Sequence, residues 1–285
     1  MKMKLAQIEE YMNSNGLKFN VEKTQLMTMN PGQSRKNKDL CILFNNHLIN
    51  QDESTKFLGI RISNNLRWNE YIQNSEDSLL NFCNMRLRAL KLMSRQCDQK
   101  QRMLLANGMI ISKITYCLSV WGNASIFLKQ KVQSVLTETY RVVKQDFSSS
   151  TRSVHESLKM LSLDGWIRYL DLMTGKKIID FQKPRDMMEK LINNAREDHV
   201  VLFGRTMEER TMMTRAMMRG NLRYTADNTT TYTPRHNSFI PRFVRLYNQL
   251  DGITKSKNLA TSPWYEKDEF RLDVKYKCFK EQIYY

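Results

Sequence analysis

The first 65 residues combine one apolar stripe with short apolar runs between turn residues, a pattern typical of a helix followed by a small sheet. Leu5, Ile8 and Met12 lie on one face of a predicted opening helix, which ends at Asn15-Gly16. The short runs that follow are bounded by Pro, Gly, Asn and Ser, as strands usually are. The predicted strands are 25–29, a hairpin of 41–44 and 47–49 around Asn45-Asn46, and 55–62.

The last of these strands carries a strict alternation. Leu58, Ile60 and Ile62 fall on one face, and Phe57, Gly59 and Arg61 fall on the other. We expect the first set to face the sheet core. A glycine inside a strand marks a bulge or the close approach of another backbone.

The period becomes helical after Trp68. Leu79, Cys83, Leu87 and Leu90 form the core stripe of a helix predicted over 70–95. We expect Trp68 and Trp121 to be core anchors at helix boundaries. Further helices are predicted over 98–118, from 125 to 143 with Leu128, Val132, Val135, Leu136 and Val143 inward, 153–161, from 163 with Trp166, Leu170 and Met173, and 238–250 with Phe243, Val244, Tyr247 and Leu250 inward.

Capping residues mark three of these helix starts. Asp98 with Gln101, and Ser153 with Glu156, have the spacing of a capping box, and Ser125 is a candidate N-cap. The segment 184–235 predicts helices broken by a loop, and no order is predicted beyond Gly252.

These patterns predict a mostly α-helical α+β protein, in which a small antiparallel sheet precedes a helical bundle and further helices. We expect three regions: 1–65 with the sheet, 66–150 with the bundle, and 151–285, which is helical and partly irregular.

The charge balance is strongly basic. The 285 residues include 45 Lys and Arg against 29 Asp and Glu, a formal net charge of +16. The excess is +3 over 1–65, +6 over 66–150 and +7 over 151–285. Because the positive charge is spread over the chain rather than held in a tail, a polyanion such as nucleic acid is the favoured partner, and an ordinary basic protein is the alternative.

Several other functions have no sequence signal. Five cysteines without a metal or redox spacing indicate reduced thiols. We find no signal peptide and no apolar run long enough for a membrane span, so we expect a nuclear or cytoplasmic protein without a membrane partner. No Asp-Asp pair, Walker loop, GxSxG or HExxH occurs. The nearest carboxylate pairs, Glu76-Asp77 and Glu197-Asp198, are predicted to lie on solvated helix faces. We therefore predict no catalytic residue and no metal site.

Five segments of the chain resemble reverse transcriptases of non-LTR (LINE-type) retrotransposons. Residues 15–27 look like the NGLxxNxxKT segment of that family, and 55–62 with 66–68 look like the xxYLGVxLdxxLxW element. The other three similar segments are 114–122 (LxYcxxvWG), 158–163 (LgxLsL) and 243–250 (FNxLP, with Leu250-Asp251 in place of Leu-Pro).

The resemblance implies a place within a polymerase. Segment 15–27 is similar to motif D, so Lys23 matches the lysine that lies near the incoming triphosphate. Segment 55–62 is similar to motif E, the primer grip, a β-hairpin, and the helices after Trp68 match the thumb. The palm aspartates that hold Mg²⁺ in the intact family enzyme precede motif D, and this chain starts after them. By itself the chain is expected not to be an enzyme and to need no cofactor.

The resemblance and the charge pattern together name candidate contacts with nucleic acid. Phe57, Leu58 and Gly59 match the primer grip, and glycine allows a sugar-phosphate backbone to come close. Arg88, Lys91 and Arg95, spaced i, i+3 and i+7, could follow successive phosphates. The alternatives are a solvated surface for the basic residues and for Lys23, sheet core for Leu58 and a bulge at Gly59.

Three functions remain open from the sequence. The first is a polymerase fragment that retains binding to RNA or an RNA/DNA duplex, without catalysis. The second is half of a polymerase that a separate catalytic part completes. The third is a helical scaffold that binds protein, for example a partner covering the truncated palm sheet.

Overall fold

The computed structural model describes most of the chain, and all statements below concern these residues. They are 2–18, 20, 23–29, 41–44, 47–187, 239–250, 259 and 264–280. The predicted turn at Asn45-Asn46, the pair Glu197-Asp198 and nearly all of 184–235 lie outside them, as does the side chain of Val244.

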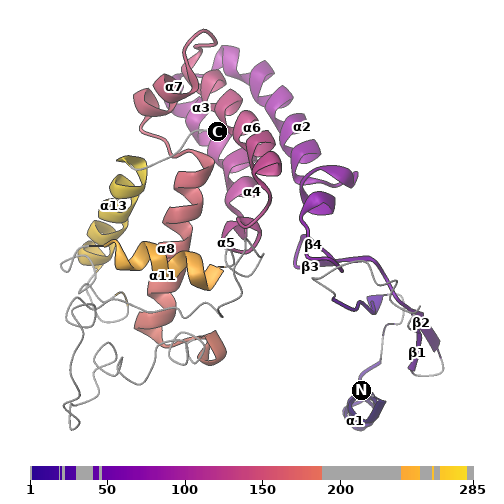
Figure 1. Cartoon of the computed structure of the whole chain (residues 1–285). Coiled ribbons are helices and arrows are strands. Elements are labelled where there is room, and N and C mark those ends of the chain that lie inside the picture. The colour runs from indigo at the N-terminus through magenta and orange to yellow at the C-terminus, as the bar shows by residue number, and fades with distance from the viewer. Residues whose placement is uncertain are drawn as a thin grey trace, which may run out of the picture. The chain divides into compact units, whose positions relative to one another are not determined.

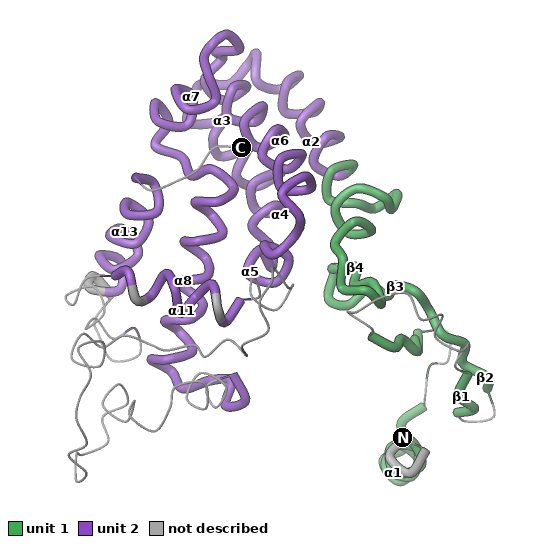
Figure 2. Tube along the Cα trace, viewed as in Figure 1, with its two compact units in different colours: residues 1–81 green, residues 82–285 purple. Residues whose placement is uncertain are grey.

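The chain divides into two compact units, residues 1–81 and 82–285 (Figure 2). The first unit contains the helix α1 (Lys2–Ser14), four short strands and a π-helical turn at Glu70–Asn74. The second unit is helical. It includes most of the predicted region 66–150 together with 151–285, because helix α6 (Ile126–Lys144) packs against both α7 (Thr151–Leu158) and α8 (Leu163–Phe181).

The strands form two separate antiparallel hairpins. Strand β1 (Cys41–Phe44) pairs with β2 (His47–Asn50), which confirms the first predicted hairpin. Strand β3 (Ser54–Phe57) pairs with β4 (Ile60–Ser63), so the predicted single strand 55–62 is wrong. The predicted strand 25–29 is also absent from the described chain: only Leu26 pairs there, in a single parallel bridge with Gln51.

The helices after Trp68 are shorter than predicted (Figure 1). Helix α2 starts at Leu79 rather than near residue 70, and the predicted helix 98–118 is divided by a π-helical turn and by a break at Tyr116-Cys117. The remaining helices of the second unit are α2 (Leu79–Met93), a 3-10 turn (Ser94–Gln96), α3 (Gln99–Ala106), the π-helical turn Asn107–Ile111, α4 (Ser112–Thr115), α5 (Leu118–Trp121), α11 (Phe239–Asn248) and α13 (Trp264–Lys280).

Two of the three predicted caps are confirmed. Asp98 and Gln101 form the complete capping box of α3, and the Ser125 hydroxyl accepts a hydrogen bond from the Leu128 amide at the start of α6. The prediction for Ser153 is wrong, since Ser150 caps α7 and accepts from the Ser153 amide. Serines at 148, 149, 150 and 153 all suit an N-cap, so the pattern alone did not select the right one.

The apolar stripes predicted for the long helices are buried. This holds for Trp68, Trp121 and the stripes of α2 and α6: Leu79, Cys83, Leu87, Leu90, Leu128, Val132, Val135, Leu136 and Val143. A polar group lies in the same interior, because the wholly buried His155 ring contacts Gln133 and Thr137, with its Nε2 3.3 Å from Gln133 Nε2 and 3.2 Å from Thr137 Oγ1.

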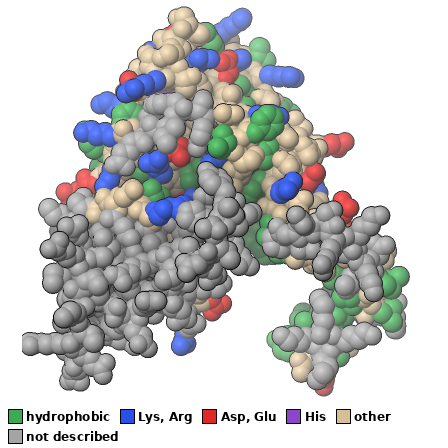
Figure 3. Space-filling view, in the orientation of Figure 1, with side chains coloured by type: hydrophobic (Ala, Val, Ile, Leu, Met, Phe, Trp, Pro, Cys, Tyr) green, Lys and Arg blue, Asp and Glu red, His purple; other side chains and the backbone are tan. Residues whose placement is uncertain are grey.

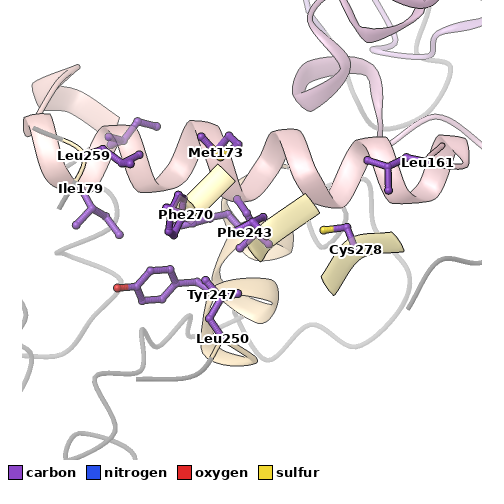
Figure 4. Packing of buried hydrophobic residues seen from close by; sticks show 12 residues of the cluster. Leu161, Met173, Ile179, Phe243, Tyr247, Leu250, Leu259, Phe270 and Cys278 are labelled. Atoms are coloured by element: carbon purple, nitrogen blue, oxygen red, sulfur yellow. The ribbon is translucent and has the colours of Figure 1, made fainter. Parts of the chain in front are cut away.

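A second apolar cluster joins α8 to α11 and α13 (Figure 4). Phe243 of α11 and Phe270 of α13 lie against α8, and both side chains are fully buried. The Phe243 ring fits over Gly175, where an added Cβ would lie 2.2 Å from Phe243 Cδ2. Helix α13 was not predicted. The protein is thus mostly helical with two small antiparallel sheets, as the sequence indicated.

Candidate nucleic-acid interface

The segment that matches the primer grip is the β3–β4 hairpin. Its turn consists of Leu58 and Gly59, whose φ angles are +48° and +80°. Two residues with positive φ are the requirement of a tight type I′ hairpin turn, which matches the twist of the strands. Gly59 therefore serves the turn and not a bulge, and Leu58 pays the steric cost of a left-handed backbone.

The tip of this hairpin presents apolar side chains to solvent. Leu58 is 74% exposed and Phe57 is 63% exposed, whereas Ile60, the partner of Phe57 across the strands, is buried. The expectation that Leu58 faces a sheet core is wrong, because the turn places it beyond the last strand pair. Phe57, Leu58 and Gly59 lie together at one point of the first unit.

Ion pairs fix the sides of the hairpin. Lys56 Nζ lies 2.7 Å from Asp77 Oδ2, and Arg61 Nη2 lies 3.3 Å from Asp77 Oδ1. The Lys56 hydrogen bond is the main reason that the pKa of Asp77 is lowered to about 2. Asp77 lies in a turn and not on the predicted helix face, and it compensates part of the charge beside the hairpin.

The three predicted phosphate-binding residues share the exposed side of α2 and the turn after it. Arg88 and Lys91 belong to α2 and Arg95 to the 3-10 turn, and all three are exposed. Lys91 Nζ forms an ion pair of 2.8 Å with Glu138 Oε1. For Arg88 and Arg95 the described part of the chain contains no ion pair, so their charge is available to a ligand.

The same face of α2 has apolar residues that the sequence analysis did not single out. Met85 and Leu92, seven residues apart, are 59% and 76% exposed. At 100° per residue they lie beside Arg88 and Arg95 around the helix axis. The surface is therefore a mixed basic and apolar stripe, with Met85 and Leu92 along one side.

Acidic residues are scarce around this stripe. From Leu79 to Thr137 the sequence has nine Lys and Arg residues and one acidic residue, Asp98, which caps α3. Figure 3 shows Lys and Arg side chains spread over the upper part of the face in view, with fewer Asp and Glu. A surface with this imbalance attracts polyanions through a salt-dependent interaction.

A set of cation–aromatic contacts on α2 and α4 was also missed. Arg86 Cζ lies 5.2 Å from the centroid of the Phe82 ring. Lys113 Nζ lies 5.6 Å from the Phe82 centroid and 5.8 Å from that of Tyr116. The sequence signal was weak, because only Phe82 and Arg86 share an i, i+4 spacing on one helix.

Lys23 lies in the first unit, apart in sequence from the other candidates. Its side chain is exposed, and its backbone amide donates a 3.0 Å hydrogen bond to Asn20 Oδ1. The structure brings Phe57, Leu58 and Gly59 together in the first unit. It brings Arg88, Lys91 and Arg95 together in the second.

Searches of the described residues for other kinds of site give two findings. No three His, Cys, Asp or Glu side chains in these ranges lie close enough together to hold a metal ion. Within the same ranges, no helix has both the length and the apolar character that crossing a bilayer requires. Comparison of the chain with protein-family models, with curated proteins and with solved structures finds no match.

Proposed function

We propose that this chain is the template–primer-binding part of a non-LTR retrotransposon reverse transcriptase, without the palm aspartates and without catalysis of its own. It binds an RNA/DNA or RNA duplex through the backbone phosphates. The proposal includes no cofactor, and Lys23 takes part in no chemical step. The observation that carries it is the exposed basic stripe of α2 and the following turn.

The spacing on this stripe suits a phosphate backbone. Arg88 and Arg95 are seven residues apart, which is about 10 Å along a helix axis at 1.5 Å per residue. This is about three nucleotide steps of 3.4 Å along one strand. The exposed hairpin tip at Phe57 and Leu58, with a glycine that a sugar-phosphate backbone can approach, supports the same proposal.

A second candidate function is a scaffold for protein binding. Met85 and Leu92 favour it, because exposed apolar residues seven apart on one helix face suit an apolar partner helix. The paired residues Leu43 and Leu48 of β1 and β2 are exposed in the same way. This candidate predicts binding that depends little on salt.

The test is binding of a fluorescein-labelled RNA/DNA hybrid, followed by fluorescence anisotropy at 50 and 200 mM salt. The full chain is compared with Arg88→Gln/Arg95→Gln and with the control Arg152→Gln/Arg271→Gln, which removes two exposed charges elsewhere in the same unit. Lys91 is left unchanged because it pairs with Glu138.

We expect the α2 variant to bind more weakly and to lower the slope of log affinity against log salt by about 2, since each lost phosphate contact contributes about 0.9. The control should keep the slope of the unchanged chain. Equal slopes for all three proteins would refute the proposed interface. A flat slope with no measurable hybrid binding would favour the protein scaffold.

A further inference from the structure

The break between α4 and α5 has a backbone that needs an explanation. Cys117 adopts the left-handed conformation, with φ of 50° and ψ of 29°, between Thr115 at the end of α4 and Leu118 at the start of α5. Such a conformation costs about 1–2 kcal/mol for a residue other than glycine. Strained residues of this kind gather at functional sites.

Two neighbours hold this break in place. The buried Trp121 donates a hydrogen bond of 3.1 Å from its indole Nε1 to the Tyr116 carbonyl oxygen. Gly122 lies so close to the Leu118 carbonyl oxygen that an added Cβ would be 2.6 Å from it. The segment 114–122 is thus built around a fixed change of direction.

The break places an aromatic ring at the surface. Tyr116 is 43% exposed, while Ile114 and Leu118 on either side of it are buried. Lys113 stands over this ring and also over Phe82, which in turn has Arg86 over it. We call Phe82, Arg86, Lys113 and Tyr116 the Tyr116 platform.

The platform has cations and aromatic rings, and its own helices carry no acid. Neither α2 nor α4 contains an Asp or Glu, and the carboxylate of Asp98 accepts the amide of Gln101 at the cap of α3. Exposed aromatic rings beside cations are the elements with which proteins bind single-stranded nucleic acid: bases stack on the rings and phosphates lie near the charges. An apolar partner protein would leave Lys113 and Arg86 without counter-charge.

We propose that the Tyr116 platform binds an unpaired stretch of nucleic acid, with one base stacked on Tyr116 and the adjacent phosphates near Lys113 and Arg86. This inference rests on the proposed function, since it gives the chain a single-strand site in addition to the duplex contacts of Arg88 and Arg95. The site accepts RNA or DNA, because stacking on an aromatic face requires no particular sugar.

The experiment measures binding of fluorescein-labelled U12 and dT12 single strands, and of a blunt RNA/DNA hybrid, to the full chain. Tyr116→Leu removes the ring and keeps an apolar side chain, and Tyr116→Phe keeps the ring. We expect Tyr116→Leu to weaken single-strand binding about 5- to 150-fold, the range that corresponds to 1–3 kcal/mol per stacked base, and to leave hybrid binding unchanged. Tyr116→Phe should stay within about twofold of the unchanged chain.

A second measurement does not depend on any variant. Cys117 is exposed beside the platform, so a bound dT12 strand should slow its alkylation by iodoacetamide, while alkylation of the exposed Cys41 in the first unit continues at the same rate. Peptide mass mapping separates the two thiols.

The outcomes separate the two proposals. Unchanged single-strand binding in Tyr116→Leu, or no slowing at Cys117, overturns the platform, and hybrid binding that still depends on Arg88 and Arg95 would leave the proposed function standing. Single-strand binding that needs Tyr116, without hybrid binding, supports the platform and overturns the duplex proposal. A chain that binds none of these probes refutes both.

Discussion

Arg242 and Asp171 form a buried ion pair between residues 71 positions apart in the sequence. Arg242 Nε lies 2.7 Å from Asp171 Oδ2, and Arg242 Nη2 lies 3.1 Å from Asp171 Oδ1 and 2.8 Å from the Ser119 carbonyl oxygen. The Asp171 side chain is wholly buried. Burial raises the pKa of this carboxyl group, while the Arg242 hydrogen bond opposes the rise. The pair connects α11 to α8 and to the end of α5.

The first prediction concerns this pair. Arg242→Met should lower the free energy of unfolding by about 3–5 kcal/mol, because it leaves the Asp171 charge buried without its partner. The double variant Arg242→Met/Asp171→Leu should recover much of that loss, since no buried charge remains. Urea unfolding followed by circular dichroism measures both. A loss below about 1 kcal/mol in the single variant would contradict the buried pair.

The second prediction concerns the contact between α8 and α11. Gly175→Ala should destabilise the protein by about 1–3 kcal/mol, because the new methyl group would overlap the Phe243 ring. Gly108→Ala is the matched control, since no atom lies within 4 Å of its added Cβ and alanine favours a helix by about 1 kcal/mol. Thermal unfolding compares the two. If Gly175→Ala raised the melting temperature as Gly108→Ala should, Phe243 would not be packed there.

The third prediction concerns pH and the buried His155. Burial lowers the pKa of this imidazole to about 4, from about 6.5 in an unfolded chain. Because the unfolded chain binds the proton more readily, stability is full above about pH 6.5 and falls as the pH decreases toward 4. His155 alone should cost the folded state about 2 kcal/mol at pH 5 relative to pH 7.5.

The control for this prediction is His155→Gln, which cannot gain the charge. The free energy of unfolding is measured by urea titration at pH 7.5 and pH 5 for both proteins. The decrease between the two pH values should be smaller in the variant by about 2 kcal/mol. The same decrease in both proteins would mean that His155 is not buried in its neutral form.

The fourth prediction compares the two units by hydrogen exchange. The hairpins of the first unit are each two-stranded, with Leu43, Leu48, Phe57 and Leu58 exposed, and two-stranded hairpins are marginally stable in water. The amides of β1 to β4 should therefore exchange at least about tenfold faster than those of α6 and α8. Equal protection in strands and helices would contradict this expectation.

The sequence predicted well the features that depend on neighbours along the chain. The stripe from Leu128 to Val143 repeats every three to four residues, so any partner must cover that face, and all five of its predicted residues are buried. The cap at Asp98 was predictable for the same reason, because its hydrogen-bond partner Gln101 is three residues away.

The sequence failed where a local pattern fits two structures. Alternation at Leu58, Ile60 and Ile62 suits one strand, and it also suits a hairpin whose turn falls at Leu58-Gly59. For the exposed Arg88 and Arg95 the sequence supplied the helix face, and only the structure shows that Lys91 beside them pairs with Glu138. The partner lies 47 residues farther along the chain, beyond the reach of any periodic pattern.

Helix α13 shows the same limit from the opposite side. Its buried residues Phe270, Val274 and Cys278 are spaced by four, yet charged residues surround them, so the segment predicts no core by itself. It becomes part of the core because α8 offers an apolar surface to it. The sequence by itself determined the helical class, the main apolar faces and the basic balance, which are properties of composition and of short spacing. The tertiary structure alone decided the hairpin turn, the break at Cys117 and the ion pair of Arg242, because burial against distant residues stabilises conformations that local preference disfavours.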